Sequence, residues 1–191
     1  MRAFVIAMES EAEVVRRHLN ADDRLFVSGI GKVNAAAATQ RAIDAGATEV
    51  WNVGVAGELG VEILGVYEIG RAVEYDFDLS EVNGTSVGVH DERVTPYFAL
   101  QPKGLFPAKT LGSGDHFTES EAETALLRRL GVEIRDMEGA AIAHVCEANK
   151  IPFTAIKAIT DLIGAGAVSD FRRNLPLALA RLDAALGKIV S

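Results

Sequence analysis

Short apolar runs alternate along this chain with longer segments of mixed or alanine-rich character. The first run, Ala3 to Ala7, is continuous and apolar, and it predicts a buried strand within residues 1–8. Residues 9–19 carry acidic side chains at their start and basic ones at their end, an order that suits the dipole of a helix. Repetition of this alternation predicts further strands at 24–28, 49–55, 66–75, 86–89, 110–112, 132–136 and 153–160, and helices at 33–45, 118–130, 138–148 and about 170–189.

Glycine, proline and capping residues mark the boundaries of these elements. Gly70 interrupts a predicted strand and is expected to form a bulge. The segment Gly54–Gly57 follows a strand and is expected to form a loop. Thr118, with Glu121 three residues later, is typical of a helix N-cap. Residues 79–109 are rich in glycine and proline, so short strands joined by loops are expected there.

Strands that alternate with helices of this length predict an α/β fold with a mostly parallel sheet. The chain has 191 residues. One hydrophobic core can grow to about 250–300 residues, so a single domain spanning residues 1–191 is expected. Hydrophobic residues make up 49% of the chain, which is enough to build an ordinary globular core.

Charge and composition exclude several classes of partner. The formal net charge is −8 and no lysine or arginine cluster interrupts it, so nucleic acid is not expected as a partner. No run of 18 apolar residues predicts a membrane span. The single cysteine, Cys146, cannot form an internal disulfide, and no histidine or cysteine spacing resembles a metal site. The chain begins as a strand rather than a leader peptide, which makes a cytoplasmic location the expectation.

Five polar motifs follow predicted strands, and in a parallel sheet they would meet at one edge, where α/β folds bind ligands. An acidic residue after a strand is more often a helix N-cap than a catalytic group. Convergence of several such motifs nevertheless favours a binding site. The motifs are Glu9 with Glu11, Gly54–Gly57, Ser113–Phe117, Asp136–Glu138 and Asp161.

The two acids Glu138 and Asp161 suit cleavage of a glycosidic bond. That reaction needs a general acid for the leaving group, a carboxylate near the reacting carbon, and hydrogen bonds to the sugar hydroxyls. Asp161 follows an apolar strand and could be desolvated enough to stay protonated as the acid. Glu138 lies at a helix N-terminus and is expected to stay ionised and bind a pair of sugar hydroxyls. Met137 and Phe117 offer apolar faces to a sugar and a base.

Other polar features are better explained without a catalytic role. The turn Gly29–Lys32 could cradle a phosphate, but it lacks the full phosphate-binding patterns and is interpreted as a tight strand–helix turn. His116 is interpreted as an exposed loop residue. His90 is expected in a solvated turn. His144 and Cys146 lie within a helix, where they are expected to pack or to face solvent.

The motifs together resemble the 5′-methylthioadenosine/S-adenosylhomocysteine nucleosidases, within the purine nucleoside phosphorylase superfamily. They are spread over nearly the whole chain. Such a set is specific to the superfamily and less so to one substrate. The matching segments are Ala7–Glu11, Ser28–Ala36, Gly54–Gly57, Tyr75–Asp78, Ser113–Phe117, Asp136–Cys146 and Ala158–Asp161.

On the sugar side, the resemblance implies that Glu11 activates the water that attacks the anomeric carbon. Glu138 would bond the ribose hydroxyls, with Met137 packed against the sugar. The family often has a hydroxyl residue at the position of Val55 and an arginine at that of Lys157. Because lysine lacks the bidentate fork of arginine, a contact near the ribose or the acidic cluster is expected to differ.

On the base side, the resemblance implies that Phe117 stacks on the purine and that the backbone of Thr118 bonds its edge. Asp161 would protonate or hydrogen-bond to N7, so that adenine leaves as a neutral base. The implied fold is a mixed sheet curled toward a barrel and flanked by helices. The implied enzyme needs no metal or organic cofactor, acts on a small-molecule nucleoside and forms a homodimer.

These observations favour hydrolysis of the N-ribosidic bond of a 5′-substituted adenine nucleoside. The stretch after the first strand, residues 9–13, is acidic where a phosphorylase presents arginines, and it would repel phosphate. A phosphate-dependent phosphorylase stays the alternative, as does a futalosine-type nucleosidase, because the shortened region 79–109 normally helps to build the pocket for the 5′ group. A non-catalytic nucleoside-binding protein is an alternative of another class. Retention of Glu11, Glu138 and Asp161 argues against it.

Overall fold

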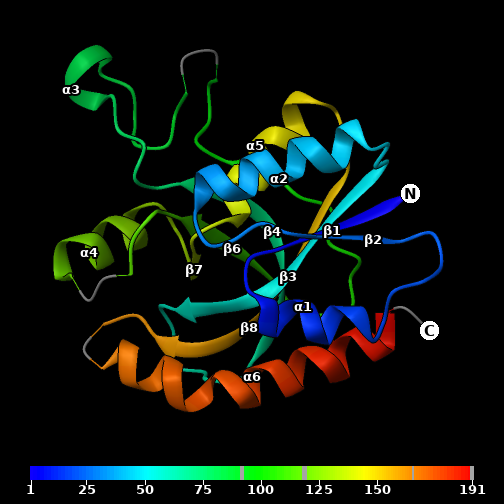
Figure 1. Ribbon diagram of the computed structural model, residues 1–191. Coiled ribbons are helices and arrows are strands. Elements are labelled where there is room, and N and C mark those ends of the chain that lie inside the picture. The colour runs from blue at the N-terminus through cyan, green and yellow to red at the C-terminus, as the bar shows by residue number, and fades with distance from the viewer. Residues whose placement is uncertain (91–92, 118–119, 165, 190–191) are drawn as a thin grey trace.

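Five strands close into a barrel at the centre of the protein (Figure 1). The computed structural model describes residues 1–90, 93–117, 120–164 and 166–189. In the barrel, β3 pairs with β8, β8 with β4, β4 with β6, β6 with β7, and β7 with β3 again. The barrel strands are β3 (Glu49–Glu58), β4 (Val66–Glu74), β6 (Ala108–Ser113), β7 (Ile134–Asp136) and β8 (Phe153–Leu162).

Three shorter strands extend this barrel. β1 (Arg2–Ile6) runs parallel to β3, and β2 (Arg24–Val27) runs parallel to β1. β5 (Phe98–Ala99) pairs antiparallel with β4. The sheet is therefore mixed, because β3–β7 and β4–β8 are also antiparallel. The α/β class is confirmed and the curled, mixed sheet agrees with the resemblance. The broader prediction of a mostly parallel sheet misses the antiparallel pairs that close the barrel.

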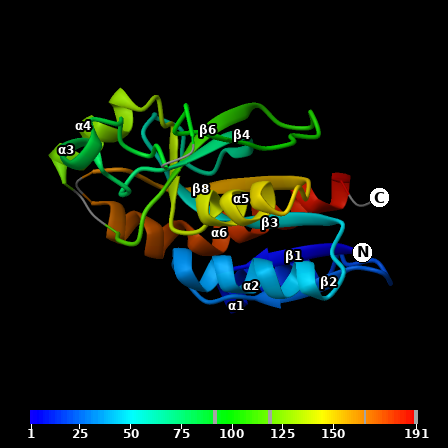
Figure 2. The ribbon, with the colours of Figure 1, turned by 90° about the horizontal axis from the view of Figure 1, so that it is seen from above.

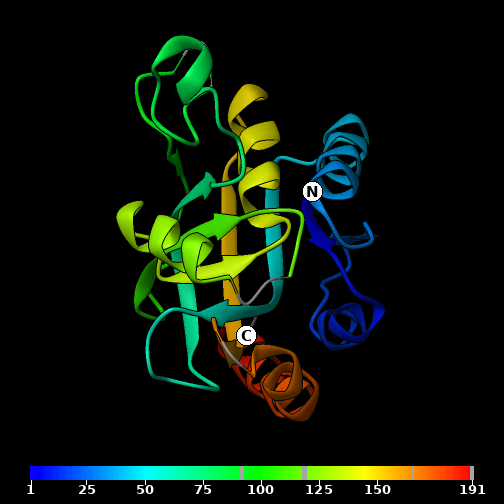
Figure 3. The same cartoon turned by 90° about the vertical axis from the view of Figure 1, so that its left-hand side faces the viewer.

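Helices cover the barrel on two opposite sides (Figures 1 and 3). On one side α2 (Lys32–Asp44) packs beside α5 (Gly139–Ala148), as Figure 2 also shows. On the other side α6 (Ala167–Ile189) lies along β8 and contacts α1 (Glu9–Arg16). α4 (Glu121–Arg129) precedes β7, and the short α3 (Ser80–Asn83) lies in the segment after β4. In the described part of the chain, no helix is long and apolar enough to cross a membrane.

The core fills the space between the strands and these two helical layers. Small side chains such as Ala35 and Ala140 are fully buried in the layer that contains α2 and α5. A second cluster joins β1, β3 and β8 to α1 and α6 through Phe4, Trp51 and Leu182. Each large apolar side chain contributes about 1.5–3 kcal/mol on full burial. The apolar runs of the sequence are thus strands that bury both faces.

The element boundaries correct several local predictions. Residues 54–57 are not a loop but continue β3, where a register shift lies between Ala56 and Gly57. The predicted strand at 86–89 is absent, and the short β5 lies further along the chain. Ser120 caps α4, because its side chain accepts the Glu123 N–H. The irregularity at Gly70 is confirmed by a register shift between Ile69 and Arg71.

Candidate active site

A cavity of about 380 Å³ opens beside the ends of β1, β3, β7 and β8. All five predicted strand-end motifs contribute lining residues. The expected convergence is therefore observed. The lining residues are Ala7, Met8, Glu11, Ile30, Val55, Ala56, Gly57, His116, Phe117, Arg135, Asp136, Met137, Glu138, Thr160, Asp161 and Phe171.

Glu11 is buried at the floor of this cavity and is held by backbone donors. The Met8 N–H donates to its Oε2 at 3.0 Å, and the Val55 N–H donates to its Oε1 at 2.8 Å. A Cβ atom at Gly54 would lie 2.6 Å from Oε1, so only glycine admits the carboxylate there. Burial raises the pKa of Glu11, although Lys157 and the two N–H donors oppose it.

Asp136 and Lys157 form a buried ion pair beside Glu11 and Glu138. The Lys157 Nζ lies 2.7 Å from Asp136 Oδ2, and the Gly139 N–H also donates to this carboxylate. The Ser113 hydroxyl donates to Asp136 Oδ1. Burial lowers the pKa of Lys157, but the surrounding carboxylates outweigh burial and raise it overall. Lys157 is thus a charged support behind the cavity and not part of its lining.

Glu138 is the N-cap of α5 and faces the turn that precedes α2. The Gly31 N–H donates to its Oε1 at 2.8 Å, and Gly31 has a φ of 104°, which favours glycine. Burial, then the charge of Asp136, raises the pKa of Glu138 to about 7. Burial and the like charge of Asp136 thus oppose the helix dipole that was expected to keep this group ionised. The Gly29–Lys32 turn binds a carboxylate of the protein itself.

Asp161 is the penultimate residue of β8 and is buried. The Thr160 hydroxyl donates to its Oδ1 at 2.7 Å, and its buried Oδ2 has no hydrogen-bond partner among the described residues. Burial raises the pKa of Asp161, and the Thr160 hydroxyl and Arg135 only partly oppose it. A Cβ atom at Gly57 would lie 2.8 Å from Oδ2. The expectation that this acid is desolvated is confirmed.

Aromatic side chains form the outer wall of the cavity. Phe117 is 44% exposed and meets the Phe171 ring edge-on, with the ring centroids 6.0 Å apart. The Arg135 guanidinium lies 5.2 Å from the Phe117 ring centroid. Arg135 also donates to Glu123 Oε1 at 2.9 Å, and His116 pairs with the other oxygen of Glu123. Phe117 is therefore placed to stack on a flat ligand.

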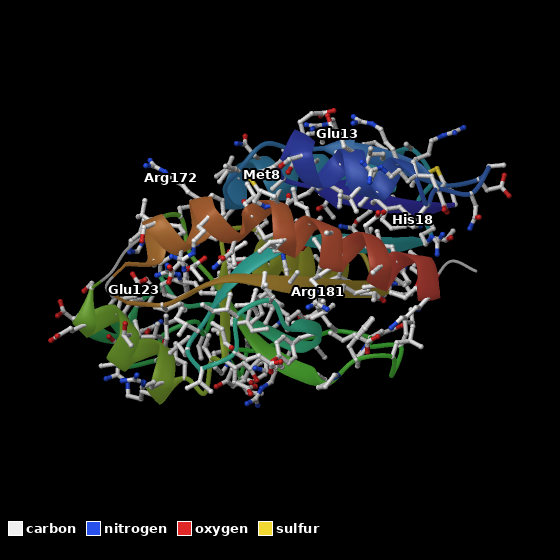
Figure 4. The ribbon with its side chains drawn as sticks, turned by 90° about the horizontal axis from the view of Figure 1, so that it is seen from below. Met8, Glu13, His18, Glu123, Arg172 and Arg181 are labelled. Atoms are coloured by element: carbon white, nitrogen blue, oxygen red, sulfur yellow. The ribbon has the colours of Figure 1, made fainter. Side chains whose placement is uncertain are left out.

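Side chains from distant elements converge on this region (Figure 4). Met8 follows β1 and lines the cavity, whereas Glu123 lies on α4 and anchors Arg135. Seen from below, the N-terminal half of α6 lies between these two residues. Phe171 on that part of α6 completes the cavity wall.

Comparison with known proteins gives the family. The model of the phosphorylase superfamily matches residues 105–191. A 5′-methylthioadenosine/S-adenosylhomocysteine nucleosidase from Thermotoga maritima is 38% identical over 153 residues, which are 76% of this chain and 68% of that protein. The chain belongs to this nucleosidase family.

Two further relatives show the breadth of the family. An aminodeoxyfutalosine nucleosidase from Campylobacter jejuni is 31% identical over 166 residues, with 77% of this chain and 71% of that protein aligned. The crystal structure of the 5′-methylthioadenosine/S-adenosylhomocysteine nucleosidase from Neisseria meningitidis, in complex with methylthio-immucillin-A, has a TM-score of 0.86 and 27% identity. It covers 97% of this chain and 96% of that one. The resemblance expected from the motifs is thus confirmed.

Six of the eight predicted site residues line this one cavity. Glu11, Val55, Phe117, Met137, Glu138 and Asp161 all line it. Lys157 lies behind the lining, and Thr118 lies outside the described residues.

Sequence reasoning missed several residues of the cavity. Asp136 belongs to one of the predicted motifs but was not assigned a role there. Its position at the end of a strand is the signal that could have identified it as a residue of the cavity. Arg135 is a charged residue within an apolar strand. A buried charge needs a partner, and this could have indicated a polar site around Arg135. Ile30 and Phe171 carry no such signal, because only packing brings their elements to the cavity.

Proposed function

We propose that this protein hydrolyses the N-ribosidic bond of a 5′-substituted adenine nucleoside, of the methylthioadenosine or S-adenosylhomocysteine type, and releases adenine. The observation that carries the proposal is the charge of the cavity. Three buried carboxylates, Glu11, Asp136 and Glu138, surround the single ammonium of Lys157. Asp161 adds a separate, desolvated acid.

An acidic floor suits the transition state of this reaction. As the bond to the base breaks, the ribose takes on oxocarbenium character and positive charge. A group of carboxylates that outnumbers the one ammonium beside it stabilises that state more than it stabilises the neutral nucleoside. Glu11 is the base that would activate the attacking water. Each of its oxygens already accepts one backbone N–H, and each keeps a second lone pair for the water.

Glu138 and Met137 would hold the ribose. The Gly31 N–H occupies one oxygen of Glu138 and orients the carboxyl group, so its other oxygen can bind the ribose hydroxyls. Met137 lines the cavity next to it and offers an apolar surface to the sugar. Val55 lines the same part of the cavity.

Asp161 would assist departure of the base. Its raised pKa favours the protonated carboxyl, which can donate to N7 as the bond to C1′ breaks. Phe117 would stack on the purine, and the backbone of Thr118 would bond its edge. Lys157 would act indirectly, by holding Asp136 in place through their ion pair and so keeping the floor of the cavity ordered. No metal or organic cofactor is needed for these steps.

The charge of the cavity argues against a phosphorylase. A phosphate nucleophile would have to approach the carboxylate of Glu11. Among the described residues, the two cations nearest to Glu11 already form ion pairs with carboxylates of the protein. Lys157 binds Asp136, and Arg135 binds Glu123. A water nucleophile meets no such repulsion.

The decisive experiment separates water from phosphate as the nucleophile. The protein is incubated with methylthioadenosine, S-adenosylhomocysteine, aminodeoxyfutalosine, futalosine or inosine, each with and without phosphate, and free base is measured by chromatography. Release of adenine without phosphate supports hydrolysis and ranks the 5′ groups. Release only with phosphate would overturn the proposal in favour of a phosphorylase. Tight binding without any release would favour a binding protein.

We also propose a homodimer, a cytoplasmic location and a role in recycling methionine-derived nucleosides. The dimer is supported by apolar side chains next to the cavity. Ile30 lines the cavity yet is 53% exposed, and Val33 on the adjacent turn of α2 is 79% exposed. A second chain that covers α2 would bury both. Light scattering coupled to gel filtration tests this, and a monomeric mass would contradict it.

A further inference from the structure

Three side chains that could bind a metal ion meet outside the candidate active site. Glu74 ends β4, His90 lies in the following segment, and His144 lies on α5. One ligand atom from each lies within 4.8 Å of the other two. The His144 Nδ1 is 2.9 Å from Glu74 Oε1, and the His90 Nε2 is 3.9 Å from the same oxygen.

Aromatic rings hold the two histidines in place. Phe77 stacks on His90 with ring centroids 3.9 Å apart, and Phe98 stacks on His144 at 4.7 Å. His90 is therefore packed between rings, which corrects its interpretation as part of a solvated turn. Its Nε2 is buried and has no hydrogen-bond partner among the described residues. A buried ring nitrogen without a partner costs free energy unless something binds it.

The charges around the cluster favour a divalent cation. The Lys32 Nζ lies 3.4 Å from Glu74 Oε2, the oxygen that faces away from the imidazoles, and it also pairs with Asp76. Asp115 also acts electrostatically on Lys32. These three carboxylates and one ammonium leave a formal charge of −2. Arg93, which also acts electrostatically on His90, is itself paired with Glu147, so the excess of negative charge favours a cation.

We propose that Glu74, His90 and His144 bind one divalent transition-metal ion of the Zn²⁺ type, with water in the remaining position. Two imidazole nitrogens and one carboxylate oxygen are a ligand set that Zn²⁺ accepts in tetrahedral sites. The open position would face the hollow between α2 and α5, whose lining includes Lys32, Glu74 and His144. The site is independent of the nucleosidase reaction and would tie the segment after β4 to α5.

A simple hydrogen bond explains only part of this arrangement. It accounts for the contact between His144 and Glu74, but it leaves the His90 Nε2 without a partner. A metal ion satisfies all three ligands at once. The two explanations differ in whether loss of His90 changes binding of an ion.

The test uses the full-length protein after treatment with a chelator. Zn²⁺ is titrated into it by calorimetry, and Co²⁺ is followed by its visible absorption, which reports coordination geometry. We expect one ion per chain and a rise in the melting temperature. His144→Ala and His90→Ala should each weaken binding by about tenfold or more, since even loss of an outer contact costs a factor of about 10–100.

The matched control is His18→Ala. His18 lies beside the C-terminal half of α6, where it pairs with Asp183, and should bind no ion of this site (Figure 4). This variant should keep wild-type affinity and the wild-type thermal shift. His144 is partly exposed on α5, so its alanine variant should fold; circular dichroism checks this. Equal binding by wild type and His90→Ala, or no saturable binding by the wild type, would overturn the proposal.

Discussion

The ammonium of Lys157 lies 2.7 Å from the carboxylate of Asp136, and both side chains are only 2% exposed. This pair lies under the candidate active site, next to Glu11 and Glu138. A buried pair gains little net stability, but removal of one partner leaves an uncompensated charge. Its role is therefore to keep a negatively charged floor compatible with a folded core.

Replacement of Lys157 by methionine should destabilise the protein by about 3–5 kcal/mol. Glu11 and Glu138 would lose the nearby positive charge that lowers their pKa values, so these values should rise. The loss should shrink at low pH, where these acids are protonated. Urea denaturation at several pH values measures both effects. Lys188→Met, at an exposed position of α6, is the control and should change little.

Glu138 should make stability depend on pH. Its pKa of about 7 lies above the ordinary value of 4.5, so the folded protein binds more protons than the unfolded chain between these values. The free energy of unfolding should therefore fall as the pH rises through this window. Glu138→Gln keeps an acceptor for the Gly31 N–H and should remove about 2–3 kcal/mol of this dependence between about pH 5 and 8. Parallel stability curves for the two proteins would refute this.

Glu11→Gln should abolish hydrolysis and keep ligand binding. A neutral amide cannot take a proton from water, and a factor of about 10²–10⁴ in kcat is expected. The amide has one oxygen for two N–H donors, so a small loss of melting temperature is also expected. Glu13→Gln, exposed on the same helix, is the control. Turnover by Glu11→Gln at the wild-type rate would remove Glu11 from the mechanism.

Asp161→Asn should lose base release while the fold is kept. The amide fills the same space beside Gly57 but cannot protonate N7. We expect kcat on methylthioadenosine to fall by about 10²–10⁴. The loss should be smaller for a nucleoside whose base leaves without protonation. Asp22→Asn, at an exposed position, is the control. Release of adenine by Asp161→Asn at a near-normal rate would show that Asp161 does not assist departure of the base.

Gly54→Ala tests the close approach of β3 to Glu11. The new Cβ would lie 2.6 Å from Glu11 Oε1, so the carboxylate must move away from the Val55 N–H. We expect a destabilisation of about 1–3 kcal/mol and a lower kcat. Gly70→Ala, whose Cβ would meet only Ala108 at 3.7 Å, is the matched control in β4. If both variants behave alike, the steric argument fails.

Local pattern predicted most of the elements correctly. Continuous apolar runs marked β1, β3 and β8, because strands buried on both faces carry no polar alternation. The acids that follow such runs indicated Glu11, Glu138 and Asp161 as candidate site residues. The pattern failed where glycine had two explanations. Gly54 and Gly57 were expected to form a loop, but they lie in β3. Glycine is needed at these two positions because carboxylates occupy the space that a side chain would fill.

Residue order and composition were enough to predict the α/β class, the acidic character and six of the residues that line the cavity. They could not establish protonation states, since the pKa of Glu138 depends on burial and on Asp136 rather than on its place at a helix N-terminus. Nor could they place Phe171 in the cavity, or His90 beside His144, because residues far apart in the sequence meet only when the barrel closes. Short-range pattern encodes the elements, whereas burial and long-range contacts set the electrostatics of the site.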